Sequence, residues 1–192
     1  NGAGLVHHRD SGDENVDHLI ELAFERRLNW GKHKVPPFQP INILAAGRPR
    51  WMSQLCRMAG AEAARYRKPR ITITDINYSM PKFTRYRLND LYKEHKHQFG
   101  QLERLVQSFA GKPVRYTTDQ MVSHLNREFI GPIGVPNLQK IDGEAYNSPY
   151  QLAHLLYKIG FIVARIGPED DPRQASFVTY AESPELLRYA NN

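Results

Sequence analysis

The last part of the chain predicts a capped amphipathic helix followed by a β-hairpin, and this order constrains the fold most strongly. Ser148 and Pro149 suit the N-cap and the first turn of a helix. Leucines at helical spacing follow, and Gly160 ends the pattern. Residues 161–166 and 175–181 then predict two strands that are joined by a long charged tip. We therefore expect one helix beside a small antiparallel sheet.

A further helix is expected on each side of this unit. Residues 116–129 begin with a threonine cap and carry apolar side chains on one face. Residues 130–147 are rich in glycine and proline and predict a loop, whereas residues 183–190 predict a closing helix. The order helix, helix, hairpin, helix is that of a winged helix-turn-helix, in which a hairpin wing flanks a helix pair that commonly binds DNA.

The residues before this region predict helices without strands. These helices are expected over residues 14–30, 49–66 and 101–111. Another helix is expected with Thr74 or Asp75 as its N-cap, and Pro81 should kink or interrupt it because proline lacks the backbone N–H. Residues 41–47 fit either a short strand or a helical turn.

The charge balance favours a polyanionic partner. The 192 residues include 26 Lys and Arg against 20 Asp and Glu, a formal net charge of +6. Such an excess favours nucleic acid, although a mildly basic surface without a partner fits it equally well. No apolar run is long enough to span a membrane, and no metal-ligand spacing surrounds Cys56, the single cysteine. A cytoplasmic protein without a membrane partner or a bound metal is expected.

Two arginines flank a proline where a helix is expected to begin. Gly47, Arg48, Pro49 and Arg50 follow a short apolar run, and Pro49 suits the first helical position because its missing N–H needs no partner there. The positive end of the helix dipole repels cations. These arginines are therefore either solvated or positioned to bind an anion.

This turn and its surroundings resemble the helical lid of P-loop ATPases of the AAA+ class and the related signal-transduction (STAND) branch. In those lids a G-x-P-R turn opens a helix with many small residues, as residues 47–66 do here, and a short element like "ITITD" (residues 71–75) precedes the next helix. Residues 14–28 resemble the helix that begins such lids. Residues 85–111 resemble a group of bacterial P-loop ATPases tied to conflict and defence systems.

The resemblance implies that Arg50 takes the role of the sensor 2 arginine, which reaches nucleotide phosphates, with Arg48 as the second candidate. The sequence contains no G-x-x-x-x-G-K-[ST] loop and no strand that ends in paired acids. The chain is therefore expected to be the lid and C-terminal part of a larger ATPase, whose P-loop core would bind ATP and Mg²⁺. On its own it is expected to hold no cofactor and to be no enzyme.

The expected fold class is mainly α. It combines a helical lid-type bundle with a winged helix-turn-helix that carries a small β-hairpin. The expected division is a flexible leader over residues 1–13, the bundle over residues 14–112 and the winged helix over residues 113–192.

DNA contacts in a winged helix come from the exposed face of the second helix and from the wing. The candidates on these elements are Gln151, His154, Lys158, Arg165 and Arg173. The wing tip also carries the acidic sequence "PEDDP", which would repel phosphate. Docking of a protein, or self-association, therefore stays open beside DNA binding. The alternative function is a stand-alone winged-helix transcriptional regulator that binds DNA and dimerises through its N-terminal helices.

Overall fold

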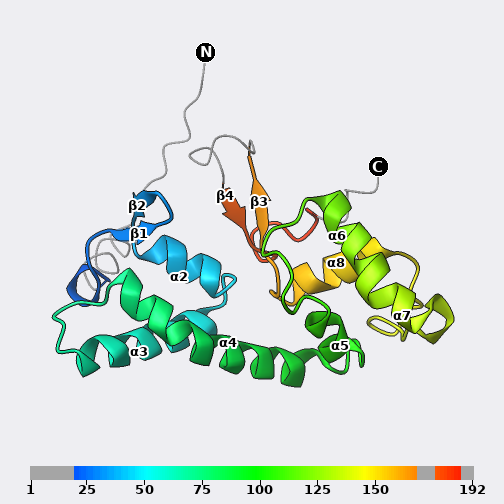
Figure 1. Ribbon diagram of the computed structural model, residues 1–192, viewed down its shortest axis with the longest axis horizontal. Coiled ribbons are helices and arrows are strands. Elements are labelled where there is room, and N and C mark those ends of the chain that lie inside the picture. The colour runs from blue at the N-terminus through cyan, green and yellow to red at the C-terminus, as the bar shows by residue number, and fades with distance from the viewer. Residues whose placement is uncertain (1–19, 168–175, 187–192) are drawn as a thin grey trace, which may run out of the picture. The chain divides into compact units, whose positions relative to one another are not determined.

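The chain is mainly helical, with small antiparallel hairpins, in a computed structural model that describes residues 20–167 and 176–186 (Figure 1). It divides into two compact units, residues 1–84 and residues 85–192. The division falls inside the long helix α4 (Ile73–His95). The expected boundary between residues 112 and 113 lies within the second unit.

The first unit begins with a hairpin that the sequence did not predict. Strands β1 (Leu28–Trp30) and β2 (His33–Val35) pair antiparallel, with Leu28 opposite Val35. Gly31 has φ +61° and is the first residue of the two-residue turn, a position where glycine is favoured. The expected helix over residues 14–30 is therefore too long: helical structure ends at Ala23, and Leu28 lies in a strand.

Two further helices complete the unit before α4. Helix α2 (Phe38–Leu44) resolves the ambiguous segment as helical, and helix α3 (Pro49–Arg65) packs against it. Four residues of α3 at intervals of four are buried: Trp51, Leu55, Ala59 and Ala63. This spacing gives one apolar face, so the periodicity that predicted α3 also defines its buried side.

Helix α4 runs without a break through Pro81, so the expected interruption does not occur. The helix begins at Ile73, so Thr74 and Asp75, the expected N-cap candidates, lie inside its first turn. Asp75 in its first turn accepts hydrogen bonds from the Thr72 backbone N–H (2.9 Å) and hydroxyl (2.8 Å). Lys68 Nζ lies 2.7 Å from Asp75 Oδ1, and the carboxylate is fully buried. Burial opposes ionisation of this carboxyl, yet the hydrogen bonds from Lys68 and Thr72 lower its pKa.

The second unit contains the helix pair and the hairpin that the sequence predicted. Its further elements are α5 (Leu102–Gln107), α6 (Thr118–His124), a π-helical segment (Leu125–Ile130), α7 (Gly131–Ile133), a 3₁₀ turn (Val135–Asn137), α8 (Pro149–Lys158), β3 (Ala164–Ile166) and β4 (Ser176–Val178). Strands β3 and β4 pair antiparallel. Residues 181–186 form turns, so the described part of the expected closing helix is not helical.

Local capping signals fix the ends of α6 and α8. Thr117 and Gln120 form a reciprocal capping box at the start of α6. Gly160 ends α8 with φ +73°, and the Arg87 guanidinium donates to its carbonyl oxygen. A cation at the carboxyl end of a helix complements the dipole.

Aromatic side chains hold the second unit together. The hydroxyl of Tyr157, a fully buried residue of α8, donates to the Thr179 carbonyl oxygen at 2.8 Å. His124 lies between Phe109 and Tyr116, with ring centroids 4.3 and 5.2 Å away. The His124 side chain is buried, and its Nε2 has no hydrogen-bond partner among the described residues. Burial lowers the pKa of this imidazole.

Candidate binding surfaces on helices α3 and α8

The first candidate surface is the turn that opens α3. Ala46 and Gly47 have φ values of +50° and +70°, so the chain reverses sharply before Arg48. Arg48 is the N-cap residue in extended conformation, and Pro49 follows in the first turn. The cap has no side-chain hydrogen bond, and the first turn of α3 contains no acidic residue. The positive end of this helix dipole therefore has no carboxylate from its own turn.

The two arginines of this turn differ in their surroundings. The Arg48 guanidinium carbon lies 4.5 Å from the ring centroid of the buried Trp51, and Arg48 is half-buried. Arg50 is exposed on the first turn. Stacking on Trp51 restricts the Arg48 guanidinium. A phosphate at this turn would meet backbone N–H groups together with exposed guanidinium donors.

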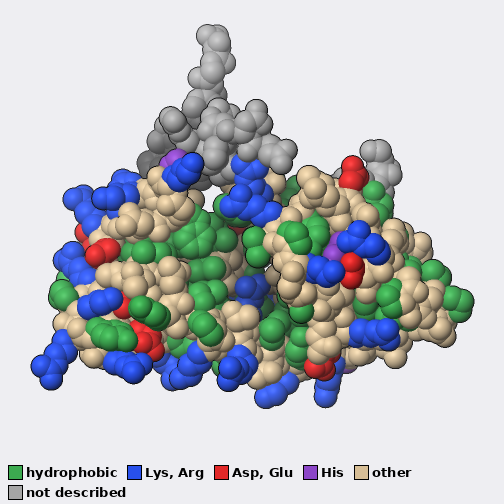
Figure 2. Space-filling view, viewed as in Figure 1, with side chains coloured by type: hydrophobic (Ala, Val, Ile, Leu, Met, Phe, Trp, Pro, Cys, Tyr) green, Lys and Arg blue, Asp and Glu red, His purple; other side chains and the backbone are tan. Residues whose placement is uncertain are grey.

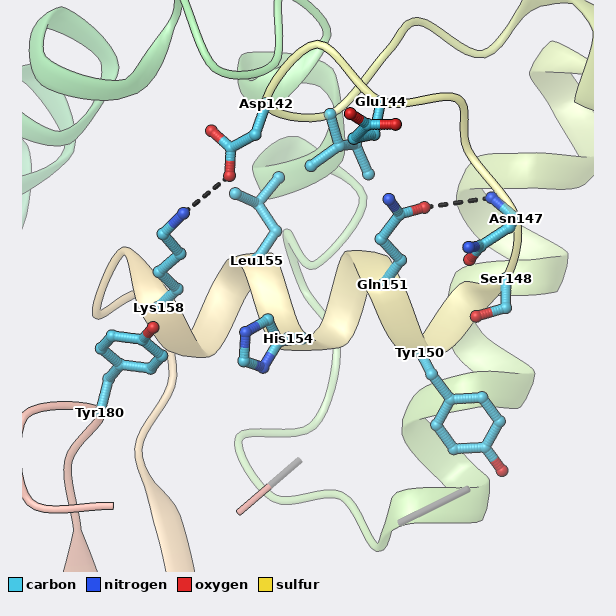
Figure 3. Close-up of a pocket in the computed structure, with 11 residues that line it drawn as sticks. Asp142, Glu144, Asn147, Ser148, Tyr150, Gln151, His154, Leu155, Lys158 and Tyr180 are labelled. Atoms are coloured by element: carbon cyan, nitrogen blue, oxygen red, sulfur yellow. Dashed lines mark hydrogen bonds and ion pairs between the residues drawn. The ribbon is translucent and has the colours of Figure 1, made fainter. Parts of the chain in front are cut away.

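The second candidate surface is one face of α8. Gln151, His154 and Lys158, the three residues proposed there for DNA contact, all line one cavity of about 370 Å³. Figure 3 shows the Gln151 and Lys158 side chains pointing toward the segment that carries Asp142 and Glu144. The structure thus brings together three predicted residues that lie on one helix.

The chain itself covers this face of α8. Lys158 Nζ lies 2.7 Å from Asp142 Oδ2, and Gln151 Oε1 accepts a hydrogen bond from the Asn147 backbone N–H at 3.1 Å (Figure 3). The His154 ring lies 5.8 Å from the ring of Tyr180, which follows β4. Every residue of α8 is buried or half-buried. The polar face of α8 is therefore the floor of a partly closed groove.

The covering segment holds the residues that sequence analysis missed. Ile141 and Glu144 exchange two backbone hydrogen bonds of 2.9 Å, and Asp142 and Gly143 between them have φ values of +51° and +85°. Two positive φ values define a tight turn in which Asp-Gly is strongly favoured. The "DG" pair in the expected loop was therefore a local signal for this turn. No local signal placed the turn over α8.

The remaining predicted residues lie on or beyond the hairpin. Arg165 is exposed on β3, opposite Phe177 of β4. Arg173 and the acidic wing tip lie outside the described residues. Burial raises the pKa of Cys56 on α3, which keeps this thiol protonated. Within residues 20–167 and 176–186, no three histidine, cysteine or acidic side chains gather as a metal site requires.

Comparison with known proteins adds no relative. No protein-family model, curated protein or solved structure matches this chain. Across the described ranges, every helix is too short or too polar to cross a membrane. The geometry of the two surfaces is therefore the basis for proposing a function.

Proposed function

We propose that the chain is the lid and C-terminal regulatory part of a P-loop ATPase, and that its second unit docks protein through the α8 groove. In this proposal Arg50, with Arg48 beside it, contacts the nucleotide phosphates held by the P-loop core. The groove contacts the same core. The chain alone performs no chemistry.

The covered face of α8 is the observation that carries this proposal. A helix that reads DNA places exposed side chains against base edges in the major groove. In this chain Lys158 is paired with Asp142 and Gln151 is hydrogen-bonded to Asn147, both in the segment that covers α8, and His154 lies beside Tyr180. A DNA backbone approaching this face would meet the carboxylates of Asp142 and Glu144, whose charge repels phosphate. A protein partner need not bring phosphates close to these carboxylates.

The contacts over the groove are weak enough to open. The Lys158 and Asp142 side chains are 34% and 41% exposed, and ion pairs this exposed contribute between 0 and about 1 kcal/mol. A protein segment with its own acidic group can therefore replace Asp142 as the partner of Lys158. The Leu155 side chain lines the groove but is only 2% exposed, so it provides apolar contact area only once the covering segment has moved.

The turn before α3 supports the nucleotide-contacting role. Arg50 is exposed beside a helix N-terminus without an acidic cap, where a phosphate supplied by another part of the protein would be favoured. Arg48 packs on Trp51 and would hold the turn in position. This part of the proposal follows the lid resemblance.

One observation favours the alternative, a DNA-binding regulator. Arg165 is exposed on β3, and wing cations in a winged helix contact DNA phosphates. A net charge of +6 agrees with such contact. This alternative is separable from protein docking because Lys158 lies in the groove and Arg165 lies on the hairpin.

Two charge reversals decide between the functions. Lys158→Glu should weaken binding of the chain to the separately produced P-loop core, and Arg165→Glu should leave that binding unchanged. The readout is titration calorimetry with the core, beside a duplex-DNA titration at low salt. Duplex binding that Arg165→Glu and Lys158→Glu both weaken would overturn the docking proposal. A reading frame upstream of the chain that lacks a P-loop would overturn the ATPase assignment.

The phosphate role of Arg50 has its own test. Arg50→Ala in the complete ATPase should lower ATP turnover by about 10- to 1000-fold, because a guanidinium that stabilises phosphoryl charge contributes several kcal/mol. Arg57→Ala is the matched control, since Arg57 is also exposed on α3 but lies two turns further along. Equal turnover in both variants would contradict the role.

A further inference from the structure

Tyr66 at the end of α3 and Tyr78 on α4 are exposed and lie close together, and the turn between these helices carries arginines. The Tyr66 and Tyr78 side chains are 55% and 64% exposed, and their ring centroids lie 6.5 Å apart with a 33° tilt. Arg65, Arg67 and Arg70 are exposed beside them. Figure 2 shows Lys and Arg side chains interspersed with hydrophobic ones over α3 and α4. We call Tyr66, Tyr78, Arg65, Arg67 and Arg70 the Tyr–Arg patch.

Two cations lie close to the Tyr66 ring: Arg65 of the patch and the neighbouring Lys68. The Arg65 guanidinium carbon lies 5.7 Å from the Tyr66 ring centroid, and Lys68 Nζ lies 5.8 Å from it. Two acids are near, but Asp75 is buried against Lys68, and Glu62 Oε2 is 3.9 Å from Arg65. Residues 62–82 carry a net charge of +3. The surface is therefore both cationic and aromatic.

The backbone holds an arginine where glycine is favoured. Arg67 has φ +54°, immediately after Tyr66 ends α3, and the following N–H of Lys68 bonds back to the Ala63 carbonyl oxygen at 3.0 Å. Residues other than glycine adopt this left-handed conformation at a cost of about 1 kcal/mol. The side chain at this position therefore opposes stability, and its charge adds to the patch.

We propose that the Tyr–Arg patch binds a single-stranded nucleic acid segment. Nucleotides supply both groups that this surface fits: phosphates for the arginines and flat base faces for the tyrosine rings. In a duplex the base faces are stacked inside and cannot reach the tyrosines. An acidic peptide supplies charge but no base faces. This contact is independent of the α8 groove and of the phosphate role of Arg50.

The test is fluorescence anisotropy with labelled oligo(rU) and oligo(dT) of about 12 nucleotides, a length suited to this class of site. Binding at about 50 mM salt should weaken as salt rises, with a log–log slope of about −2 for three phosphate contacts. Tyr66→Ala and Tyr78→Ala should each weaken binding by about 5- to 150-fold. Phe38→Ala is the matched control, because Phe38 is 51% exposed on α2 outside the patch.

Arg67→Gly separates binding from folding. Because glycine relieves the positive φ, this variant should keep or raise the urea midpoint of unfolding, yet reduce the magnitude of the salt slope by about 0.7. The two oligonucleotides distinguish RNA from DNA as the source of the strand. Three results would each overturn the proposal: no binding at low salt, equal affinity for a duplex or polyglutamate, or tyrosine variants that bind like Phe38→Ala.

Discussion

Each unit of the chain contains a lysine–aspartate pair with the same separation of 2.7 Å, but the pairs lie in different environments. In the first unit Asp75 is fully buried, and Lys68 is 31% exposed. In the second unit Asp142 is 41% exposed, and Lys158 is 34% exposed. Distance alone therefore does not distinguish a structural ion pair from one that can open.

The difference separates a fixed turn from an openable groove. A buried carboxylate left without its cation is costly, so the Lys68–Asp75 pair fixes the connection between α3 and α4. An exposed pair is screened by salt and readily exchanged, so the Lys158–Asp142 pair can yield to a partner. The four predictions below test this contrast and the stability of each unit, from the largest expected effect to the smallest.

The largest effect is expected from Lys68→Met. This change leaves the buried Asp75 carboxylate with only its Thr72 hydrogen bonds, and it should lower the free energy of unfolding by about 3 kcal/mol. Urea denaturation followed by circular dichroism measures the loss. A decrease below about 1 kcal/mol would remove the distinction between the two pairs.

Acid should destabilise the second unit through His124, with an effect smaller than that of Lys68→Met. Burial lowers the pKa of His124 in the folded chain, so the His124 imidazole binds a proton more tightly in the unfolded chain than in the folded one. Its stabilising contribution is full above about pH 6.5 and is lost as the pH falls below that value. Nearby Glu128 moderates the loss, because its charge favours the imidazolium.

Urea midpoints between about pH 8 and pH 5 measure this dependence. His124→Phe should flatten the curve in that range. Asp75 does not contribute there: its lowered pKa gives stability that is lost only as the pH falls below about 4. An unchanged pH dependence in His124→Phe would contradict the assignment.

Thr117→Ala removes the capping box of α6 and should lower the free energy of unfolding by about 1 kcal/mol. Thr118→Ala provides the control, because Thr118 lies next along the chain inside the helix. Thermal unfolding of both variants gives the comparison. Equal midpoints would show that the cap does not stabilise the second unit.

The smallest effect is expected from Lys158→Met. It should change the free energy of unfolding by less than about 1 kcal/mol, and less still at high salt. The same urea titration as for Lys68→Met measures this change. The two lysine-to-methionine substitutions thus compare two ion pairs that have the same 2.7 Å separation. A loss near 3 kcal/mol would mean that the groove is structural and does not open.

Local signals in the sequence were sufficient for α6, α8 and the β3–β4 hairpin of the second unit. The Thr117 cap before α6, Pro149 in the first turn of α8 and Gly160 after α8 predicted these helix ends within a few residues. The two segments on either side of the charged tip after Gly160 predicted β3 and β4. Each of these features depends on neighbours in the chain.

Contacts between distant residues decided what the sequence missed. Leu28 fits the helical spacing of the first segment, but the chain leaves the helix at Phe24, which forms a parallel bridge with Ile71. The backbone N–H of Ile71 donates to the Ala23 carbonyl oxygen at 2.8 Å. No periodicity near Leu28 carries information about Ile71, so the strand was assigned as helix.

The candidate site shows the same division. The sequence placed Gln151, His154 and Lys158 together because they share a helix face. It did not show that Asp142 pairs with Lys158 over this face, because that contact joins residues 16 positions apart. Residue type and spacing thus identified the groove floor, and the fold determined whether it is open to DNA.

The most direct test of the account maps backbone amide chemical shifts of the isotope-labelled chain during titration. If the groove docks the P-loop core, adding the core should change the shifts of Gln151, His154 and Lys158 and of residues 141–148. With duplex DNA at low salt, it predicts none at these positions. Shift changes along α8 with duplex, and none with the core, would contradict the proposal that this groove docks protein.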